Sequence, residues 1–120
     1  MATILIVDDY AVARRILSHT LQRRGYVVVS AADGLEALAR LDDTEVDLAI
    51  IDIAMPGMDG LTLLRRLREQ ERLQNLPVIM LSASGQDEDR QTARSLGAGD
   101  FLSKPAGSHE VVEAVSRFLA

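Results

Sequence analysis

Three aspartates in this chain follow apolar runs, a placement that suits chemistry at the edge of a sheet. Asp8 and Asp9 come directly after the apolar run 4–7, and Asp52 closes the apolar run 48–51. Because a carboxylate is costly to desolvate, it usually sits where a strand meets solvent. If the two runs are adjacent parallel strands, the three carboxylates share one edge. Clustered carboxylates repel one another, and a hard cation such as Mg²⁺ removes that repulsion with oxygen ligands alone.

A simpler interpretation applies to the first pair alone. Asp8 or Asp9 could serve only to cap a following helix, because aspartate is a favoured N-cap residue. Asp52, however, stands at the equivalent end of a second apolar run. The shared position of the three acids therefore favours a common site over a cap.

Ser82 and Lys104 occupy related positions further along the chain. Ser82 follows the apolar run 78–81, and Lys104 directly precedes Pro105. Alone, such a serine is a turn former and such a lysine is a surface charge. Beside three acids they would offer a hydroxyl donor and a cation to a phosphoryl group. Asp52 is then the candidate nucleophile, because carboxylates can form acyl phosphates.

Alternating apolar and helix-like segments predict the elements that position these residues. The apolar segments are mostly continuous, as in strands buried on both faces of a sheet. Their alternation with helices predicts an α/β fold: a five-stranded parallel sheet with helices on both faces. Ligands of such sheets bind beyond the carboxyl ends of the strands. We expect strands at Thr3–Val7, Val27–Ala31, Leu48–Asp52, Val78–Ser82 and Asp100–Ser103, and helices near 11–24, 34–41, 87–96 and 108–119, with one more after Asp59.

The predicted helices differ in how firmly their sequences anchor them. Asp59 and Ser108 are candidate N-caps, and Gly25 is a candidate C-terminal stop. The helix near 87–96 has a charged start and few apolar anchors, so we expect it to be weakly held. The apolar residues expected on the helix faces that pack are Val12, Ile16, Leu17, Leu21, Leu35, Leu38, Leu41, Leu61, Leu64, Leu67, Ala93, Leu96, Val112, Val115 and Leu119.

Length and composition predict one acidic domain over residues 1–120 with a buried core. The net charge of −5 argues against direct nucleic-acid binding, which needs a basic face. Arginines cluster in segments 14–24 and 65–72, as solvated helix faces or as a docking surface for an acidic protein. Without cysteine, a basic leader or a run near the roughly 20 apolar residues that span a bilayer, we expect a cytoplasmic protein with no membrane contact.

These signatures resemble the receiver domain of bacterial two-component response regulators over essentially the full chain. Each is weak alone, but five in this order and spacing are specific. They are Asp8-Asp9, Asp52 with the loop Met55-Pro56-Gly57-Met58-Asp59-Gly60, Ser82-Ala83, Gly97-Ala98, and Asp100-Phe101-Leu102-Ser103-Lys104-Pro105. The resemblance implies a flavodoxin-like, doubly wound (βα)5 fold with strand order 2-1-3-4-5.

The resemblance also implies a role for each acid. Asp52 would be the phosphoacceptor, taking a phosphoryl group from a phosphohistidine. Asp9 and Asp52 would bind Mg²⁺, or Mn²⁺ in its place, directly. The backbone carbonyl of Ala54 would be a third protein ligand, and Asp8 would act through a bound water.

Three further residues receive roles from the resemblance. Lys104 and the Ser82 hydroxyl would each bind a phosphoryl oxygen. Phe101 would be the aromatic switch, turning inward when Ser82 is drawn to the phosphate; an ordinary core aromatic describes the unphosphorylated state equally well. The Lys104–Pro105 peptide bond is expected to be cis.

The implied function is a phosphoacceptor switch. Its phosphate source would be a sensor histidine kinase or a phosphotransfer protein. Its target would be a downstream protein or a covalently linked output domain, reached through the face of the fourth helix, fifth strand and fifth helix. The chain would act as a monomer or a phosphorylation-dependent dimer, and as an enzyme only in promoting its own phosphorylation and dephosphorylation.

Some positions depart from the family pattern. Ala54 and Ser84 occupy the two positions that influence how water reaches the acyl phosphate, and neither side chain can act as an acid or an amide that orients water. We therefore expect a phosphorylated form of moderate to long lifetime. Ala11 replaces a small polar residue at the start of the first helix, which leaves Asp9 as its expected cap.

Three alternatives to the switch explain the sequence less well. A degenerate receiver that acts only as a protein-interaction module would not explain why every active-site position carries the residue type expected of the family. A phosphohydrolase with an aspartyl nucleophile commonly needs a second acid two residues later, where this chain has Ala54. A nucleotide-binding module needs a glycine-rich phosphate loop, and the sequence contains neither common form.

Overall fold

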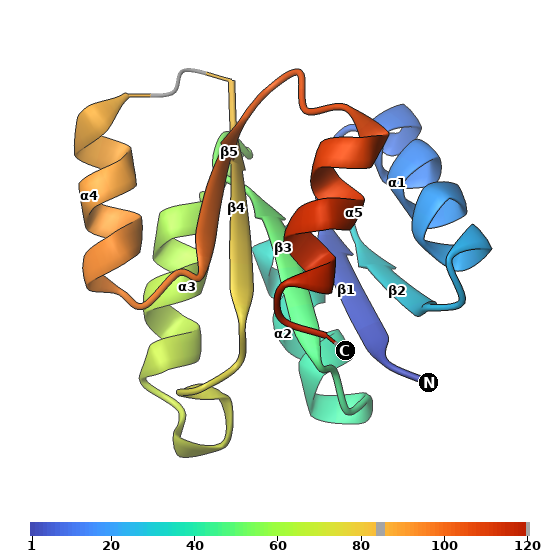
Figure 1. Cartoon of the computed structure of the whole chain (residues 1–120). Helices are drawn as coiled ribbons and strands as arrows, with labels where there is room; N and C mark the ends of the chain where they lie inside the picture. Colours follow the sequence, from blue (N-terminus) through green and yellow to red (C-terminus); the bar gives the residue numbers. More distant parts are fainter. Residues whose placement is uncertain (84–85, 120) are drawn as a thin grey trace.

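The computed structural model describes residues 1–83 and 86–119, and within them five parallel strands form one sheet in the order β2-β1-β3-β4-β5. This topology confirms the predicted fold (Figure 1), and every strand has its predicted bounds. The strands are β1 (Thr3–Val7), β2 (Val27–Ala31), β3 (Leu48–Asp52), β4 (Val78–Ser82) and β5 (Asp100–Ser103). The helices are α1 (Ala11–Arg23), α2 (Gly34–Asp43), α3 (Gly60–Arg68), α4 (Asp87–Ser95) and α5 (Ser108–Ser116), with a short 3-10 helix, η1 (Glu71–Leu73), before β4.

Helices cover both faces of the sheet. α1 and α5 pack on one face, and α2, α3 and α4 pack on the other (Figure 1). Because side chains alternate along a strand, β1 supplies both layers. Ile4 and Ile6 pack with α1 and α5, whereas Leu5 and Val7 pack with the opposite layer. All residues of β3 and β4 are buried, which explains why these segments read as continuous apolar runs.

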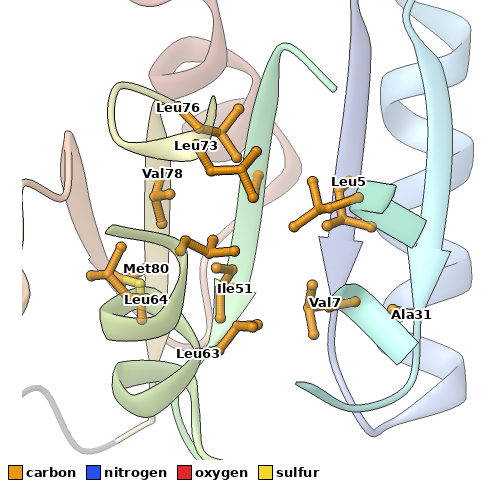
Figure 2. Close-up of a cluster of buried hydrophobic side chains, with 14 of the residues drawn as sticks. Leu5, Val7, Ala31, Ile51, Leu63, Leu64, Leu73, Leu76, Val78 and Met80 are labelled. Carbon is orange, nitrogen blue, oxygen red and sulfur yellow. The ribbon is translucent and has the colours of Figure 1, made fainter. Parts of the chain in front are cut away.

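The larger cluster of buried side chains lies between the sheet and α2, α3 and α4. In Figure 2, Ile51 and Met80 from neighbouring strands meet Leu63 and Leu64 of α3. Burying a side chain of this size stabilises a fold by about 1.5–3 kcal/mol. α3 is therefore firmly fixed to the sheet, and it fixes the loop that joins it to β3.

Side-chain caps set where α2 and α3 begin. Asp33 Oδ1 accepts a hydrogen bond from Glu36 N at 2.8 Å, and Asp59 Oδ1 accepts one from Thr62 N at 2.8 Å. Such a cap is typically worth about 1 kcal/mol. The predicted cap at Asp59 is confirmed. Gly25, which follows α1, has a φ of +93°, and this confirms the predicted stop.

Two other predicted caps are wrong. Asp9 does not cap α1: Tyr10 is the N-cap residue, makes no side-chain capping bond, and donates its N–H to Asp8 Oδ1 at 2.9 Å. The carboxylate that contacts the residue before α1 is therefore that of Asp8. Ser108 is the first helical residue of α5, and Gly107 occupies the N-cap position without a side-chain bond.

Three apolar residues predicted to pack are exposed instead. Val12 and Ile16 of α1 are 45% and 57% exposed, and Leu35 of α2 is 71% exposed. Successive helix residues are about 100° apart, so Ile16 lies on a different face from Leu17. α1 packs through Leu17 and the buried Leu21. Val12 and Ile16 therefore form an exposed apolar stripe.

The helices are short. The longest in the described part of the chain, α1, has 13 residues. Across residues 1–83 and 86–119, no helix combines the length and the apolar character needed to cross a membrane.

Candidate functional site

Four predicted site residues meet at the carboxyl edge of the sheet. Asp8 follows β1 and Asp52 ends the neighbouring strand β3. Ser82 ends β4 and pairs in register with Ser103, the residue before Lys104. The Lys104 N–H donates to the carbonyl oxygen of Ser82 at 2.7 Å. The parallel register thus brings together residues that are as much as 96 positions apart.

Asp8, Asp9 and Asp52 form an acidic cluster at this edge. One carboxylate oxygen from each residue lies within 4.8 Å of the others. Asp8 and Asp52 are 2% and 4% exposed, whereas Asp9 is open to solvent. A donor set of oxygens alone, with one exposed member, fits a hard divalent cation such as Mg²⁺ or Mn²⁺. It lacks the histidine and cysteine ligands of a typical zinc site.

Lys104 is the only lysine of the chain, and its ammonium lies between two of these acids. Lys104 Nζ is 3.1 Å from Asp8 Oδ2 and 3.2 Å from Asp52 Oδ1. Burial alone would lower the pKa of this ammonium. Its hydrogen bonds and its attraction to the two carboxylates outweigh burial, so the pKa of Lys104 is raised. Lys104 therefore stays charged at neutral pH and balances one of the carboxylates.

The surroundings of Asp52 disfavour its charged form. Burial has the largest influence and raises the pKa of the carboxyl group; attraction to Lys104 lowers the pKa, and repulsion by Asp8 and Asp9 raises it. The net direction is upward. A cation bound among the acids would act in the opposite direction, because a nearby positive charge favours the carboxylate. The site is thus electrostatically suited to gain positive charge.

Gly60 allows the backbone to close around Asp52. The Gly60 N–H donates to the Ile53 carbonyl oxygen at 2.9 Å. A Cβ atom at Gly60 would lie 2.8 Å from Ile53 Cα and even closer to the Asp52 carbonyl oxygen. Only glycine permits this approach of α3 to the end of β3. We did not predict this role from sequence; the available signal was a glycine directly after the cap Asp59.

Arg14 is a second contributor that the sequence did not reveal. Its Nη1 donates to the backbone carbonyl oxygen of Asp8 at 2.7 Å. The Asp8 N–H in turn donates to the Ala31 carbonyl oxygen at 3.2 Å. These bonds hold the backbone of Asp8 from both sides. Arg14 belongs to the basic segment 14–24, and nothing in that pattern separates it from its solvent-facing neighbours.

The remaining predicted residues lie outside the acidic cluster. Ala54 is exposed in the loop after β3. Phe101 is half-buried on β5 and packs against the larger core cluster. The Lys104–Pro105 peptide bond is cis, as the family resemblance implies. Ser84 lies outside the described residues.

Comparison with known sequences identifies relatives of this site and fold. A family model, the response regulator receiver domain, matches residues 4–116. The chain is 35% identical over 116 residues to the alkaline phosphatase synthesis transcriptional regulatory protein PhoP of Bacillus subtilis, covering 97% of this chain and 48% of that protein. It is 43% identical over 118 residues to the response regulator GtcR of Aneurinibacillus migulanus, covering 98% of this chain and 46% of that protein. The chain therefore spans about half the length of the curated relatives that it matches.

Solved structures share the whole fold. The chemotaxis protein CheY4 of Vibrio cholerae is 37% identical, with a TM-score of 0.94 over 99% of both chains. A putative response regulator from Chloroflexus aurantiacus is also 37% identical, with a TM-score of 0.92 over 98% of this chain and 97% of that one. The residues that the family model matches, 4–116, include every predicted site residue. The chain belongs to the response regulator receiver domain family of two-component signalling systems.

Proposed function

We propose that this domain, residues 1–120, is a phosphoacceptor switch in which Asp52 takes a phosphoryl group from a phosphohistidine in a cation-dependent reaction. One observation carries the proposal. A single ammonium, that of Lys104, lies 3.1 and 3.2 Å from Asp8 and Asp52, inside a cluster whose three carboxylates each place an oxygen within 4.8 Å of the others. An acceptor, a cation partner and a set of metal ligands are then available at one edge of the sheet.

The cation would be held by residues already in the cluster. Asp9 and Asp52 would bind Mg²⁺ or Mn²⁺ directly, the Ala54 carbonyl would add a third ligand, and Asp8 would act through water. When bound, the ion supplies positive charge to the phosphoryl oxygens. The exposure of Asp9 supports this assignment, because Mg²⁺ keeps several of its waters and therefore needs an open side.

The chain's own residues perform the transfer. An oxygen of the Asp52 carboxylate attacks the phosphorus atom, and a P–O bond forms while the P–N bond to the donor histidine breaks. The departing imidazole nitrogen keeps that electron pair and takes a proton from solvent. The Lys104 ammonium pairs with a phosphoryl oxygen and the Ser82 hydroxyl donates to another, so negative charge is balanced on two sides.

In the second half of the cycle, the acyl phosphate is hydrolysed. Water attacks the phosphorus atom, the P–O bond to Asp52 breaks, and the carboxylate is regenerated. The side chain at position 54 is a methyl group, which cannot orient this water. The phosphorylated form therefore has a moderate to long lifetime. Rapid loss of the phosphoryl group from the purified chain would contradict this expectation.

The partners follow from the same role. A sensor histidine kinase or a phosphotransfer protein supplies the phosphoryl group in the cytoplasm. The face made by α4, β5 and α5 transmits the change to a downstream protein or a linked output domain. One relative is named as a transcriptional regulatory protein and another as a response regulator, and each is about twice as long as this chain. The acidic domain itself makes no nucleic-acid contact, and it acts as a monomer or a phosphorylation-dependent dimer.

Intact-mass measurement tests this function. The parent chain is incubated with acetyl phosphate or phosphoramidate, with and without Mg²⁺, beside Asp52→Ala. The expected result is one added phosphoryl group, in the parent only and only with Mg²⁺. If no phosphoryl group is added under any condition, the chain is a degenerate receiver that acts through its unmodified surface.

A further inference from the structure

α4 is anchored to the domain by few buried side chains. Its first turn contains three acids, and Ala93 is its one buried residue among those that the structure describes. By contrast, α3 buries three leucines. α4 lies beside β5, the edge strand of the sheet (Figure 1). An element with few buried apolar contacts opens or shifts at low free-energy cost. The contacts that do hold α4 therefore control where it can move.

One end of α4 is fixed by Arg68. The Nε of Arg68 donates to the Leu96 carbonyl oxygen at 2.8 Å, and its Nη2 donates to the Gly97 carbonyl oxygen at 3.0 Å. Its Nη1 donates to the carbonyl oxygens of Leu73 and Leu76 at 3.0 and 2.9 Å. One guanidinium thus joins the end of α3, the segment around η1 and the carboxyl end of α4. Two of these four hydrogen bonds, those to Leu96 and Gly97, hold the carboxyl end of α4 to the firmly packed helix α3.

The other half of α4 meets β5 through Arg90. The N-cap residue Gln86 makes no side-chain capping bond. In the described part of the chain, the charged group over the ring of Phe101 is the Arg90 guanidinium, whose central carbon is 4.7 Å from the ring centroid. Both residues are half-buried, which strengthens a cation–π contact relative to full exposure. The ring also packs against the core cluster that contains Ala93.

We propose that Arg90 is a positioning residue that restrains the Phe101 ring in the unmodified domain through the cation–π contact between them. The inference rests on the proposed function and on the family resemblance, which implies that Phe101 turns toward Ser82 after phosphorylation. Since Arg68 holds the carboxyl end of α4, the ring can turn in two ways. It either leaves the guanidinium or draws the Arg90 end of the helix with it.

The size of the effect follows from the strength of the contact. A partly exposed cation–π pair shifts an equilibrium by about two- to five-fold. Arg90→Ala should therefore raise the population of the turned ring by about that factor. Alanine is the best helix former, so this change does not weaken α4 through its helix propensity. Arg90→Lys keeps a cation that can reach the ring and should restore part of the restraint.

Arg94 provides a matched control. It belongs to the same helix and lines the same small cavity beside the ring, of about 110 Å³, together with Arg90, Ala93 and Phe101. The guanidinium that lies over the Phe101 ring is nevertheless that of Arg90. Arg94→Ala removes the same charge from α4 without removing that contact. A general effect of charge would appear equally in both variants.

The ring can be observed directly because the chain has only two phenylalanines, Phe101 and Phe118. Protein labelled with fluorophenylalanine gives one fluorine resonance for each ring, and Phe118→Leu assigns them. In unmodified Arg90→Ala, the Phe101 resonance should move toward its position in the phosphorylated parent. Arg90→Lys should move it less, and Arg94→Ala should leave it in place. The initial rate of phosphorylation by acetyl phosphate should rise about two- to five-fold in Arg90→Ala.

Two results would overturn the inference. One is a Phe101 resonance in Arg90→Ala that coincides with that of the parent. The other is an equal displacement in Arg90→Ala and Arg94→Ala. If the parent takes up no phosphoryl group, the proposed function fails, and the resonances of the unmodified variants still decide whether Arg90 restrains the ring.

Discussion

At the scale of single residues, Lys104 determines the charge balance of the site. The chain has no other lysine, and this one contacts two buried carboxylates that would otherwise repel each other. Its side chain is 28% exposed, so it remains within reach of an incoming phosphoryl group. The same ammonium therefore stabilises the cluster and, under the proposed function, would be available to the phosphoryl group.

Lys104→Met removes this charge and keeps most of the side-chain volume. We expect the free energy of unfolding to fall by about 1–3 kcal/mol without divalent cations, because two buried carboxylates lose their partner. Mg²⁺ should restore part of the loss, since it supplies the missing positive charge. Urea unfolding with and without Mg²⁺ measures both effects, and Lys104→Arg is the charge-preserving control. Equal stability of parent and Lys104→Met would contradict the assignment.

Asp52 makes a pH-dependent contribution to stability. Below the ordinary aspartate pKa of 3.8, the folded and unfolded chains both hold the proton, so Asp52→Asn should change little. As pH rises, the unfolded chain ionises first, because burial raises the pKa of Asp52 in the folded chain. The parent then loses stability relative to Asp52→Asn until the folded carboxyl group has also ionised.

The measurement is urea unfolding of the metal-free parent and Asp52→Asn across acidic to neutral pH. We expect Asp52→Asn to be the more stable at neutral pH and the difference to vanish at low pH. If Asp52→Asn is instead less stable than the parent at neutral pH, the prediction is wrong, and the attraction between Asp52 and Lys104 outweighs the cost of burying the carboxylate.

At the scale of elements, the sequence predicted the strands well because their environment is simple. β3 and β4 are buried at every position, so their apolar runs have sharp ends. The edge of the sheet where Asp8, Asp52, Ser82 and Lys104 meet follows from those ends alone. These four residues could thus be predicted to meet once the sheet was expected to be parallel.

Helix faces and close backbone contacts could not be predicted in the same way. Val12 and Ile16 are apolar and correctly spaced for a packed stripe, yet both are exposed, because α1 uses the neighbouring stripe. The predicted Asp9 cap was wrong because Tyr10, which directly precedes the first helical residue Ala11, occupies the N-cap position. The contribution of Gly60 depends on how near two backbones approach, and a sequence pattern does not contain that distance.

Gly60→Ala tests the close approach of α3 to Asp52. Its Cβ atom would lie 2.8 Å from Ile53 Cα, so the start of α3 must shift. We expect a loss of about 1–3 kcal/mol in unfolding free energy and weaker Mg²⁺ binding. Gly107→Ala is the matched control: its φ is −69° and no atom lies within 4 Å of the added Cβ. Equal effects of the two substitutions would contradict the role assigned to Gly60.

At the scale of the whole molecule, stability is unevenly distributed around the sheet. α3 and the central strands share a dense core, whereas α4 contributes Ala93 alone among its described residues. Under the proposed function, a signal generated at Asp52 would meet a helix that can respond without disturbing the core. The proposed reaction site would then be fixed, and the proposed output face would be adjustable.

Hydrogen–deuterium exchange tests this distribution. Peptides from α4 should exchange earlier than peptides from α3 in the unmodified protein, because few buried side chains oppose local opening of α4. Phosphorylation should change the exchange of α4 and leave that of β3 and β4 unchanged. Identical exchange of α4 in both forms would argue against its part in the output.

The most direct test of the central claim is to identify the phosphorylated residue chemically. Borohydride reduces an aspartyl phosphate to homoserine, which marks the acceptor in a peptide mass map. After incubation with acetyl phosphate and Mg²⁺ and then reduction, we predict homoserine at position 52 alone. Its appearance at position 8 or 9, or at no position, would contradict the account of Asp52 as the phosphoacceptor.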